Sequence, residues 1–136
     1  MILIDANVFM YAAGAPHPHK QPSLNLLERV AKGEVDALAD VEVLQEILHR
    51  YRAAGRWEQG SQVFDHARLI VHTWLPIDAA DLTRARALMD THPQLGARDA
   101  LHAAVCINAD ATAICSYDRD FDAVSAITRV EPHEVY

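Results

Sequence analysis

Short apolar runs alternate with longer stretches of helical periodicity along the whole chain. The short runs predict buried strands at residues 2–4, 35–39, 70–75 and 111–115, and an edge strand at 127–131. Apolar residues spaced three and four apart predict helices over 8–13, 22–32, 41–55, 57–68, 79–90 and 98–109, with a short turn or helix over 119–125. This alternation is typical of α/β proteins, so we expect a three-layer α/β/α sandwich around a central, mostly parallel sheet.

Individual residues indicate where helices begin and which faces they bury. Asp40 is placed to cap the helix that follows it, and Gly33 and Gly55 are placed to end two helices. The residues expected on buried faces are Leu24, Leu27 and Val30 in 22–32; Val41, Leu44, Leu48 and Tyr51 in 41–55; Leu82, Ala85, Leu88 and Met89 in 79–90; and Leu101, Ala104 and Val105 in 98–109.

The composition fits one soluble domain over residues 1–136. Hydrophobic residues make up 51% of the chain and charged residues 23%, and a chain of this length can bury a core without disulfides. The N-terminal segment has no basic residue and meets an acid at position 5, which is untypical of a secretory signal, and no apolar run is long enough for a bilayer. We expect a cytoplasmic protein that does not bind membranes, with Cys106 and Cys115 as buried thiols.

The charge balance argues against a protein that holds nucleic acid by bulk positive charge. Lysine and arginine number 12 against 19 aspartates and glutamates, a formal charge of −7. Acids that bind divalent cations count as negative in this sum, and two such cations would reduce it to about −3. The position of the acids therefore matters more than their number.

Four acids fall where parallel sheets usually carry their chemistry. Asp5 and Asp118 follow predicted strands, Glu46 lies two turns into the helix after the second strand, and Asp99 opens a helix. Ligands bind outside the carboxyl ends of such strands, so these acids are expected at one rim. Carboxylates held close together repel one another unless a hard cation such as Mg²⁺ or Mn²⁺ is bound. Such a cation can activate water and stabilise a phosphoryl oxygen, which is the chemistry of phosphodiester hydrolysis.

Spacing alone leaves other interpretations open for each acid. Asp5 could merely cap a helix, and Asp99 could merely interact with a helix dipole. Glu42 lies one turn before Glu46 on the same face. The run of Asp118, Asp120 and Asp122 resembles half a calcium loop, but it lacks the glycine and the distal glutamate of an EF-hand.

Four segments together resemble the signature segments of PIN-domain ribonucleases, especially the VapC-type toxins of prokaryotic toxin–antitoxin pairs. They are ILIDANVF at residues 2–9, VEVLQEILHRY at 41–51, ARDALHAAVC at 97–106 and ICSYDRDFDAV at 114–124. The resemblance extends over the whole chain. It implies a PIN-like fold and an active site of acids that bind Mg²⁺ or Mn²⁺.

The resemblance also assigns roles to individual residues. It implies Asp5, Glu46, Asp99 and Asp118 as catalytic, metal-binding acids and thereby favours Glu46 over Glu42. Asp122 is implied at a second metal, whereas Asp120 resembles part of the turn. Asn7 and Ser116 match supporting polar positions of the family.

Other residues have both a functional and a structural interpretation. Four arginines near the acids, Arg50, Arg52, Arg98 and Arg119, are candidates for contact with the RNA backbone, but they could equally balance the acids or complement helix dipoles. A zinc site at His17 and His19 lacks a third ligand, and His102 fits a role in packing or as a partner for buried polar groups.

The resemblance implies a metal-dependent endoribonuclease toxin that cleaves RNA, with structured RNA such as tRNA as the common substrate. It also implies a homodimer, a cognate antitoxin that inserts a segment across the cleft, and operator DNA bound only through that antitoxin. The alternatives are a housekeeping RNA-processing nuclease and a non-catalytic subunit of a repressor complex. An aspartate-based phosphatase is disfavoured because the only lysines, Lys20 and Lys32, lie early in the chain.

Overall fold

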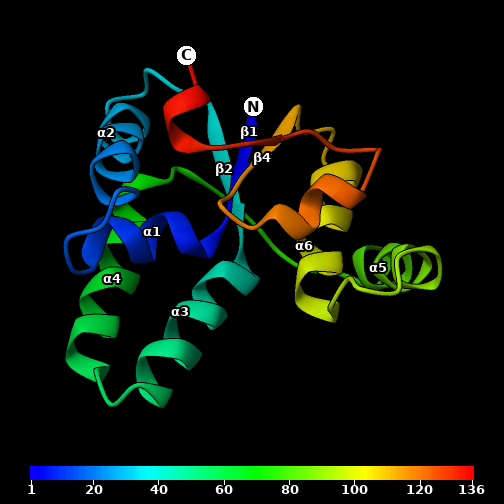
Figure 1. Ribbon diagram of the computed structural model, residues 1–136, viewed down its shortest axis with the longest axis horizontal. Helices are drawn as coiled ribbons and strands as arrows, with labels where there is room; N and C mark the ends of the chain where they lie inside the picture. The colour runs from blue at the N-terminus through cyan, green and yellow to red at the C-terminus, as the bar shows by residue number, and fades with distance from the viewer.

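A parallel sheet of five short strands forms the centre of the computed structural model, which describes residues 1–136 (Figure 1). The strands lie in the order β3-β2-β1-β4-β5, and all four neighbouring pairs are parallel. Their bounds are β1 (Ile2–Ile4), β2 (Ala37–Asp40), β3 (Thr73–Leu75), β4 (Ala113–Cys115) and β5 (Arg129–Val130). The expected parallel sheet, with 127–131 contributing an edge strand, is confirmed.

Helices cover both faces of this sheet, as the three-layer prediction requires. Figure 1 shows α1, α2 and α4 on one side and α5 and α6 on the other. The helices are α1 (Ala6–Ala13), α2 (Lys20–Ala31), α3 (Val41–Ala53), α4 (Trp57–Ile70), α5 (Ala79–Thr91) and α6 (Ala97–Asn108), with 3₁₀ turns η1 (Arg119–Ala123) and η2 (Pro132–Glu134). None of these helices combines the length and the apolar character needed to cross a bilayer.

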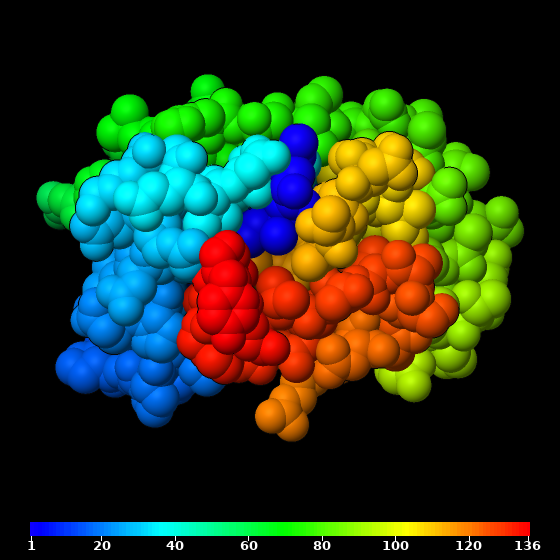
Figure 2. Space-filling view, turned by 90° about the horizontal axis from the view of Figure 1, so that it is seen from above, coloured from blue at the N-terminus to red at the C-terminus, as the bar shows by residue number.

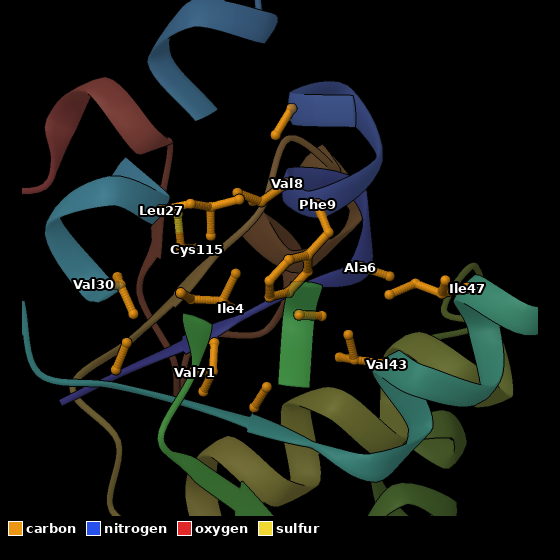
Figure 3. Close-up of a cluster of buried hydrophobic side chains, with 14 of the residues drawn as sticks. Ile4, Ala6, Val8, Phe9, Leu27, Val30, Val43, Ile47, Val71 and Cys115 are labelled. Atoms are coloured by element: carbon orange, nitrogen blue, oxygen red, sulfur yellow. The ribbon is translucent and has the colours of Figure 1, made fainter. Parts of the chain in front are cut away.

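Side chains along each strand point alternately to the two faces of the sheet, and this divides the core into two layers. Ile4 and Cys115 face the layer that α1 to α4 cover, together with Phe9 and other buried side chains (Figure 3). Leu3 and Ile114, each one position earlier, face the layer beneath α5 and α6. Successive strand side chains point to opposite faces, so each three-residue strand serves both layers. Both cysteines are buried and free, as expected.

Both ends of the chain lie at the edge of the sheet where β1 begins. Figure 2 looks onto this edge, with the first residues of the chain beside the C-terminal segment. Arg29 on α2 donates a hydrogen bond to the carbonyl oxygen of Val135 at 2.7 Å and so holds the C-terminal segment against the domain. The acids lie at the opposite edge, where the strands end.

Several predicted boundaries are wrong by a few residues. The strands expected at 35–39 and 70–75 begin at Ala37 and Thr73, and α4 continues to Ile70. Apolar residues before a strand resemble the strand itself, but only residues in register with a neighbouring strand belong to the sheet. Helix α1 begins earlier than expected, at Ala6, because Asp5 caps it.

The expected buried faces of α5 and α3 are partly wrong. Leu82 is 55% exposed and Met89 is also exposed, because α5 is an outer helix that buries only a narrow stripe around Ala85. In α3 the expected burial of Leu44 and Tyr51 is confirmed, but Val43, Glu46 and Ile47 are buried with them and Leu48 is only half-buried. Val41 and Leu24 are both exposed at the surface.

Helices α3 and α4 approach closely at Gly60, and this contact yields a prediction about stability. A methyl group on Gly60 would overlap the Cβ atom of Tyr51 and lie 2.9 Å from its Cγ atom. We therefore expect Gly60→Ala to lower the free energy of unfolding by roughly 1–3 kcal/mol, although alanine is the better helix former. Gly96→Ala is the control for steric overlap, since nothing lies within 4 Å of its methyl position and it should lose only the smaller amount by which alanine caps α6 less well than glycine. Equal urea midpoints for Gly60→Ala and the wild type would contradict this account.

Candidate active site

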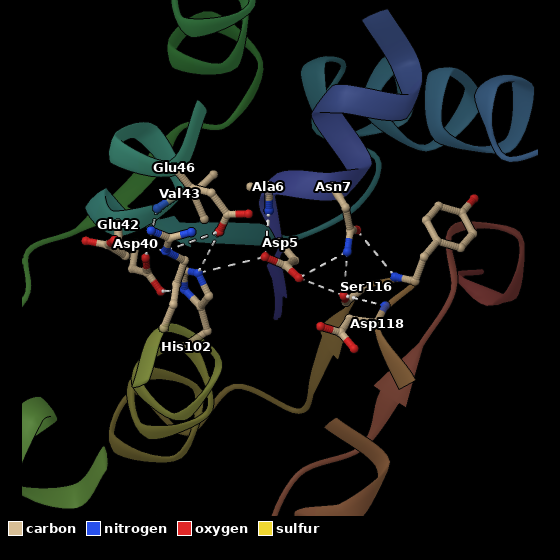
Figure 4. A network of polar contacts seen from close by, with 12 residues as sticks. Asp5, Ala6, Asn7, Asp40, Glu42, Val43, Glu46, His102, Ser116 and Asp118 are labelled. Atoms are coloured by element: carbon tan, nitrogen blue, oxygen red, sulfur yellow. Dashed lines mark hydrogen bonds and ion pairs between the residues drawn. The ribbon is translucent and has the colours of Figure 1, made fainter. Parts of the chain in front are cut away.

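Asp5 lies at the end of β1 with both carboxylate oxygens engaged (Figure 4). Its Oδ1 accepts a hydrogen bond from the backbone N–H of Ala6 at 2.7 Å, which caps α1. Its Oδ2 accepts hydrogen bonds from the hydroxyl of Ser116 at 2.7 Å and from the amide of Asn7 at 3.3 Å. Burial raises the pKa of Asp5 above its ordinary value, although the charge of His102 opposes this. The two interpretations of Asp5, a helix cap and a site acid, are therefore compatible.

Ser116 joins the ends of the two central strands. Besides donating to Asp5, its hydroxyl oxygen accepts hydrogen bonds from the Asn7 amide and from the backbone N–H of Asp118, each at 3.0 Å. Asn7 in turn accepts a hydrogen bond from the backbone N–H of Tyr117 at 3.3 Å. This network fixes Asp5 and Asp118 relative to each other, although 113 positions separate them in the sequence.

Glu46 extends from the second turn of α3 toward Asp5, and its carboxylate is buried. Its Oε2 lies 3.4 Å from Nε of Arg50, and its Oε1 lies 3.9 Å from Nε of Arg98. Burial by itself would raise the pKa of Glu46. The interaction with His102 and the charges of the two arginines outweigh burial and lower that pKa below its ordinary value. Glu42 also contacts Arg98, at 3.5 Å, but lies farther out.

Asp99 and Asp118 form a second acidic group with Asp120. A carboxylate oxygen of each lies within 4.8 Å of the others. Burial, followed by the charges of Asp118 and Asp5, raises the pKa of Asp99 to about 7. Such a shift is typical of carboxylates that share a site without a compensating cation. The bend before η1 is closed by Asp118, whose Oδ1 accepts a hydrogen bond from the backbone N–H of Asp120 at 2.9 Å.

His102 lies beneath the acids with no exposed surface. Its Nδ1 lies 2.7 Å from Oδ2 of Asp40, which is also fully buried. Asp40 in addition caps α3, as expected, by accepting a hydrogen bond from the backbone N–H of Val43. Burial alone would lower the pKa of His102, but the hydrogen bond to Asp40 and the surrounding carboxylates raise it well above its ordinary value.

The four expected acids converge on one cleft of about 500 Å³. Asn7, Arg50 and Arg98 line the cleft with them, and Ser116 lies beneath it. Arg52 instead covers the ring of Trp57 at 4.2 Å, and Arg119 is exposed outside the lining. Asp122 lies outside the cleft, and its carboxylate contacts Nε of Arg129 at 2.8 Å. Asp120 instead lies beside Asp99 and Asp118, in the position where Asp122 was expected.

Sequence reasoning missed two residues at this site, Tyr11 and Tyr117, and it named Asp40 and His102 without pairing them. Tyr11 and Tyr117 line the cleft, and Asp40 and His102 form the buried pair beneath it. The spacing of Asn7 and Tyr11, one helical turn apart, could have indicated a shared face. No sequence signal pairs Asp40 with His102, because 62 positions separate them.

Comparison with known proteins identifies the family. The PIN domain family matches residues 2–127. This chain belongs to the PIN domain family. Ribonuclease VapC13 of Mycobacterium tuberculosis is 44% identical over 130 residues, which cover 96% of this chain and 99% of that protein. The resemblance found in the sequence is thereby confirmed.

Solved structures support the fold of this PIN domain. VapBC2 from Rickettsia felis, bound to a DNA fragment from its promoter, superposes with a TM-score of 0.75 at 20% identity and covers 96% of this chain and 98% of its own. VapC20 of Mycobacterium tuberculosis, described as a toxin that cleaves the sarcin–ricin loop, has a TM-score of 0.74 at 15% identity, with coverage of 92% and 95%. At these identities the likeness extends to the fold alone.

The side chains of the PIN domain cleft fit a divalent cation. Two groups of three side chains each bring ligand atoms within 4.8 Å of one another. One group is Asp5, Glu46 and His102, and the other is Asp99, Asp118 and Asp120. Burial is the main cause of the raised pKa values of Asp5 and Asp99, and the charges of neighbouring carboxylates raise them further. A bound cation would favour the ionised form of both groups.

Proposed function

We propose that this PIN domain is a Mg²⁺- or Mn²⁺-dependent endoribonuclease that acts in the cytoplasm as the toxin of a toxin–antitoxin pair. The observation that carries the proposal is the convergence of four carboxylates, from four separate chain segments, on one cleft rimmed by arginines. Its relatives named as VapC ribonucleases support the same activity.

The chain's own residues supply the positioning for this reaction. When bound, a divalent cation would activate water and stabilise the charge that develops on the phosphoryl group. Asp5, Glu46, Asp99 and Asp118 would hold it, and Asn7 and Ser116 would keep Asp5 in place through their hydrogen bonds. Arg50 and Arg98 lie at the edge of the cleft, where their guanidinium groups would bind flanking phosphates. We expect structured RNA such as tRNA as the substrate.

The proposed partner is a cognate antitoxin. Structural neighbours of this chain come from toxin–antitoxin complexes of Rickettsia felis and Klebsiella pneumoniae. On the face of α1 turned away from the acids, Phe9, Leu27 and Val63 line an apolar groove of about 520 Å³ between α1, α2 and α4. We propose that the antitoxin covers this groove, extends a basic segment across the cleft, and carries any contact with operator DNA.

We also propose a homodimer. Trp57, Leu69 and Leu82 are large apolar side chains that the isolated chain leaves exposed. Light scattering after size exclusion should give twice the mass of 15.1 kDa. A concentration-independent monomer would contradict this part of the proposal.

Induced expression in a bacterial host tests the toxin activity. Wild type should stop growth and produce discrete new RNA ends with 5′-phosphates, whereas Asp99→Ala should do neither at equal expression. If a short open reading frame lies beside the gene, as an antitoxin requires, its co-expression should restore growth. New RNA ends without growth arrest would favour a housekeeping nuclease, and growth arrest by both wild type and Asp99→Ala would favour a non-catalytic role.

A further inference from the structure

The buried imidazole of His102 has one nitrogen that makes no hydrogen bond and has only two carboxylates at ion-pair distance. Its Nε2 is the only buried side-chain nitrogen or oxygen in the protein that makes no hydrogen bond. A buried polar atom without a partner is costly, and native proteins rarely retain one unless a water or an ion satisfies it.

The surroundings of Nε2 favour a metal ion. It lies 3.8 Å from Oδ1 of Asp5 and 3.8 Å from Oε1 of Glu46. These distances are too long for hydrogen bonds. They suit two ligands of one ion, because atoms bound at about 2.1 Å lie up to about 4.2 Å apart. The three side chains are all buried, and Asp5 and Glu46 open onto the cleft.

The other nitrogen of His102 is held as metal-binding histidines usually are. Such histidines donate their second ring N–H to a carboxylate, which fixes the tautomer and orients the ring. In this protein Nδ1 lies 2.7 Å from Oδ2 of Asp40, with both side chains fully buried. Asp40 is itself oriented by the first turn of α3, the helix that carries Glu46.

We infer that His102 is a metal ligand, which binds a divalent cation through Nε2 together with Asp5 and Glu46. This inference rests on the proposed function for the presence of a cation and adds the identity of one ligand. On binding, Nε2 gives up its proton to solvent, while Nδ1 keeps the proton that it donates to Asp40. Asp99, Asp118 and Asp120 then form an outer group with oxygen ligands only.

A nitrogen ligand changes which metal the inner group prefers. Carboxylates and water suit Mg²⁺ and Mn²⁺ alike, whereas imidazole suits transition metals better than Mg²⁺. We therefore expect Mn²⁺ to bind the inner group more tightly than Mg²⁺, and Mg²⁺ to displace it poorly. Replacing the imidazole of His102 should reduce the difference between the affinities for Mn²⁺ and Mg²⁺.

Pulsed electron paramagnetic resonance of the full chain loaded with stoichiometric Mn²⁺ tests the ligand directly. Wild type should show modulation from a coordinated imidazole nitrogen, and ¹⁵N-histidine labelling should change its pattern. His102→Gln should lose the modulation and bind Mn²⁺ roughly 10–100-fold more weakly. Asp40→Asn should also bind Mn²⁺ more weakly, but by a smaller factor. His49→Gln is the matched control, because His49 is exposed on the same helix as Glu46 and lies outside the cleft lining.

The possible outcomes distinguish a failure of the ligand assignment from a failure of the proposed function. Bound Mn²⁺ without nitrogen modulation in the wild type would overturn the inference, and His102 would then be a buried cation that offsets the acids. If such a protein still cleaved RNA, the proposed function would stand without this ligand. Failure of Mn²⁺ to bind at all would overturn both. The labelled wild type gives this answer even if His102→Gln does not fold.

Discussion

Replacing Asp5 by asparagine should lower kcat/KM for RNA cleavage at least about 100-fold while the protein remains folded. Asparagine is as good a helix cap as aspartate, so the hydrogen bond from the Ala6 N–H can be kept. Its amide nitrogen then takes the place of Oδ2, so the hydrogen bond that Oδ2 accepts from the Ser116 hydroxyl is lost. What is also lost is the negative charge that Asp5 contributes to the group it forms with Glu46 and His102, and this charge is the property that holds a cation.

Asp122→Asn is the matched control for this experiment. Asp122 is also an aspartate near the end of the sheet, but its carboxylate is exposed and contacts Arg129 rather than the cleft. We expect its kcat/KM to stay within about threefold of wild type, because surface ion pairs contribute little. Rates should be measured on a purified RNA substrate with Mg²⁺ and with Mn²⁺, with circular dichroism as the check of folding. A loss for Asp122→Asn as large as for Asp5→Asn would instead restore Asp122 to the metal site.

The order of strands and helices could be predicted from the sequence because it depends on local patterns. Apolar runs and helical periodicity identified every strand and α-helix but not the 3₁₀ turn η2, and the caps at Asp5 and Asp40 follow from residue type. The buried faces were less predictable. Leu82 matches the periodicity of α5, yet it is exposed because no further layer covers that side of the helix. Periodicity gives the spacing of a face but not how many neighbours a helix has.

The site was predictable where acids follow strands, since the carboxyl ends of parallel strands meet at one edge. The sequence could not show that Asp120, rather than Asp122, lies beside Asp99 and Asp118, because the directions of both side chains depend on the backbone of η1 and on Arg129 in β5. The pairing of Asp40 with His102 was equally hidden. It requires knowing that Asp40, at the end of β2, packs against the second turn of α6, which is a tertiary contact.

Asp99→Asn should make the metal-free protein more stable at pH 8. The pKa of Asp99 is raised to about 7 from its ordinary 3.8, first by burial and then by the charges of Asp118 and Asp5. The folded protein therefore keeps a proton that the unfolded chain releases, and the acid progressively destabilises the fold as pH rises from about 4 to about 7. Asparagine removes this cost. After allowance for the partial exposure of Asp99, the gain should be about 1–2 kcal/mol at pH 8 and should vanish near pH 4.

Divalent cations should reverse the order of stability. Wild type should gain thermal stability on addition of Mn²⁺ because binding favours the folded state, whereas Asp99→Asn should gain much less.

Without metal, Asp122→Asn should be less stable than wild type at neutral pH. The Arg129 hydrogen bond lowers the pKa of Asp122, so its negative charge stabilises the fold at neutral pH. Melting curves from pH 4 to pH 8, in chelator and in Mn²⁺, measure all three proteins. If metal-free Asp99→Asn is less stable than wild type at pH 8, the acids of the cleft do not repel one another, and the main electrostatic argument for a cation at this site fails.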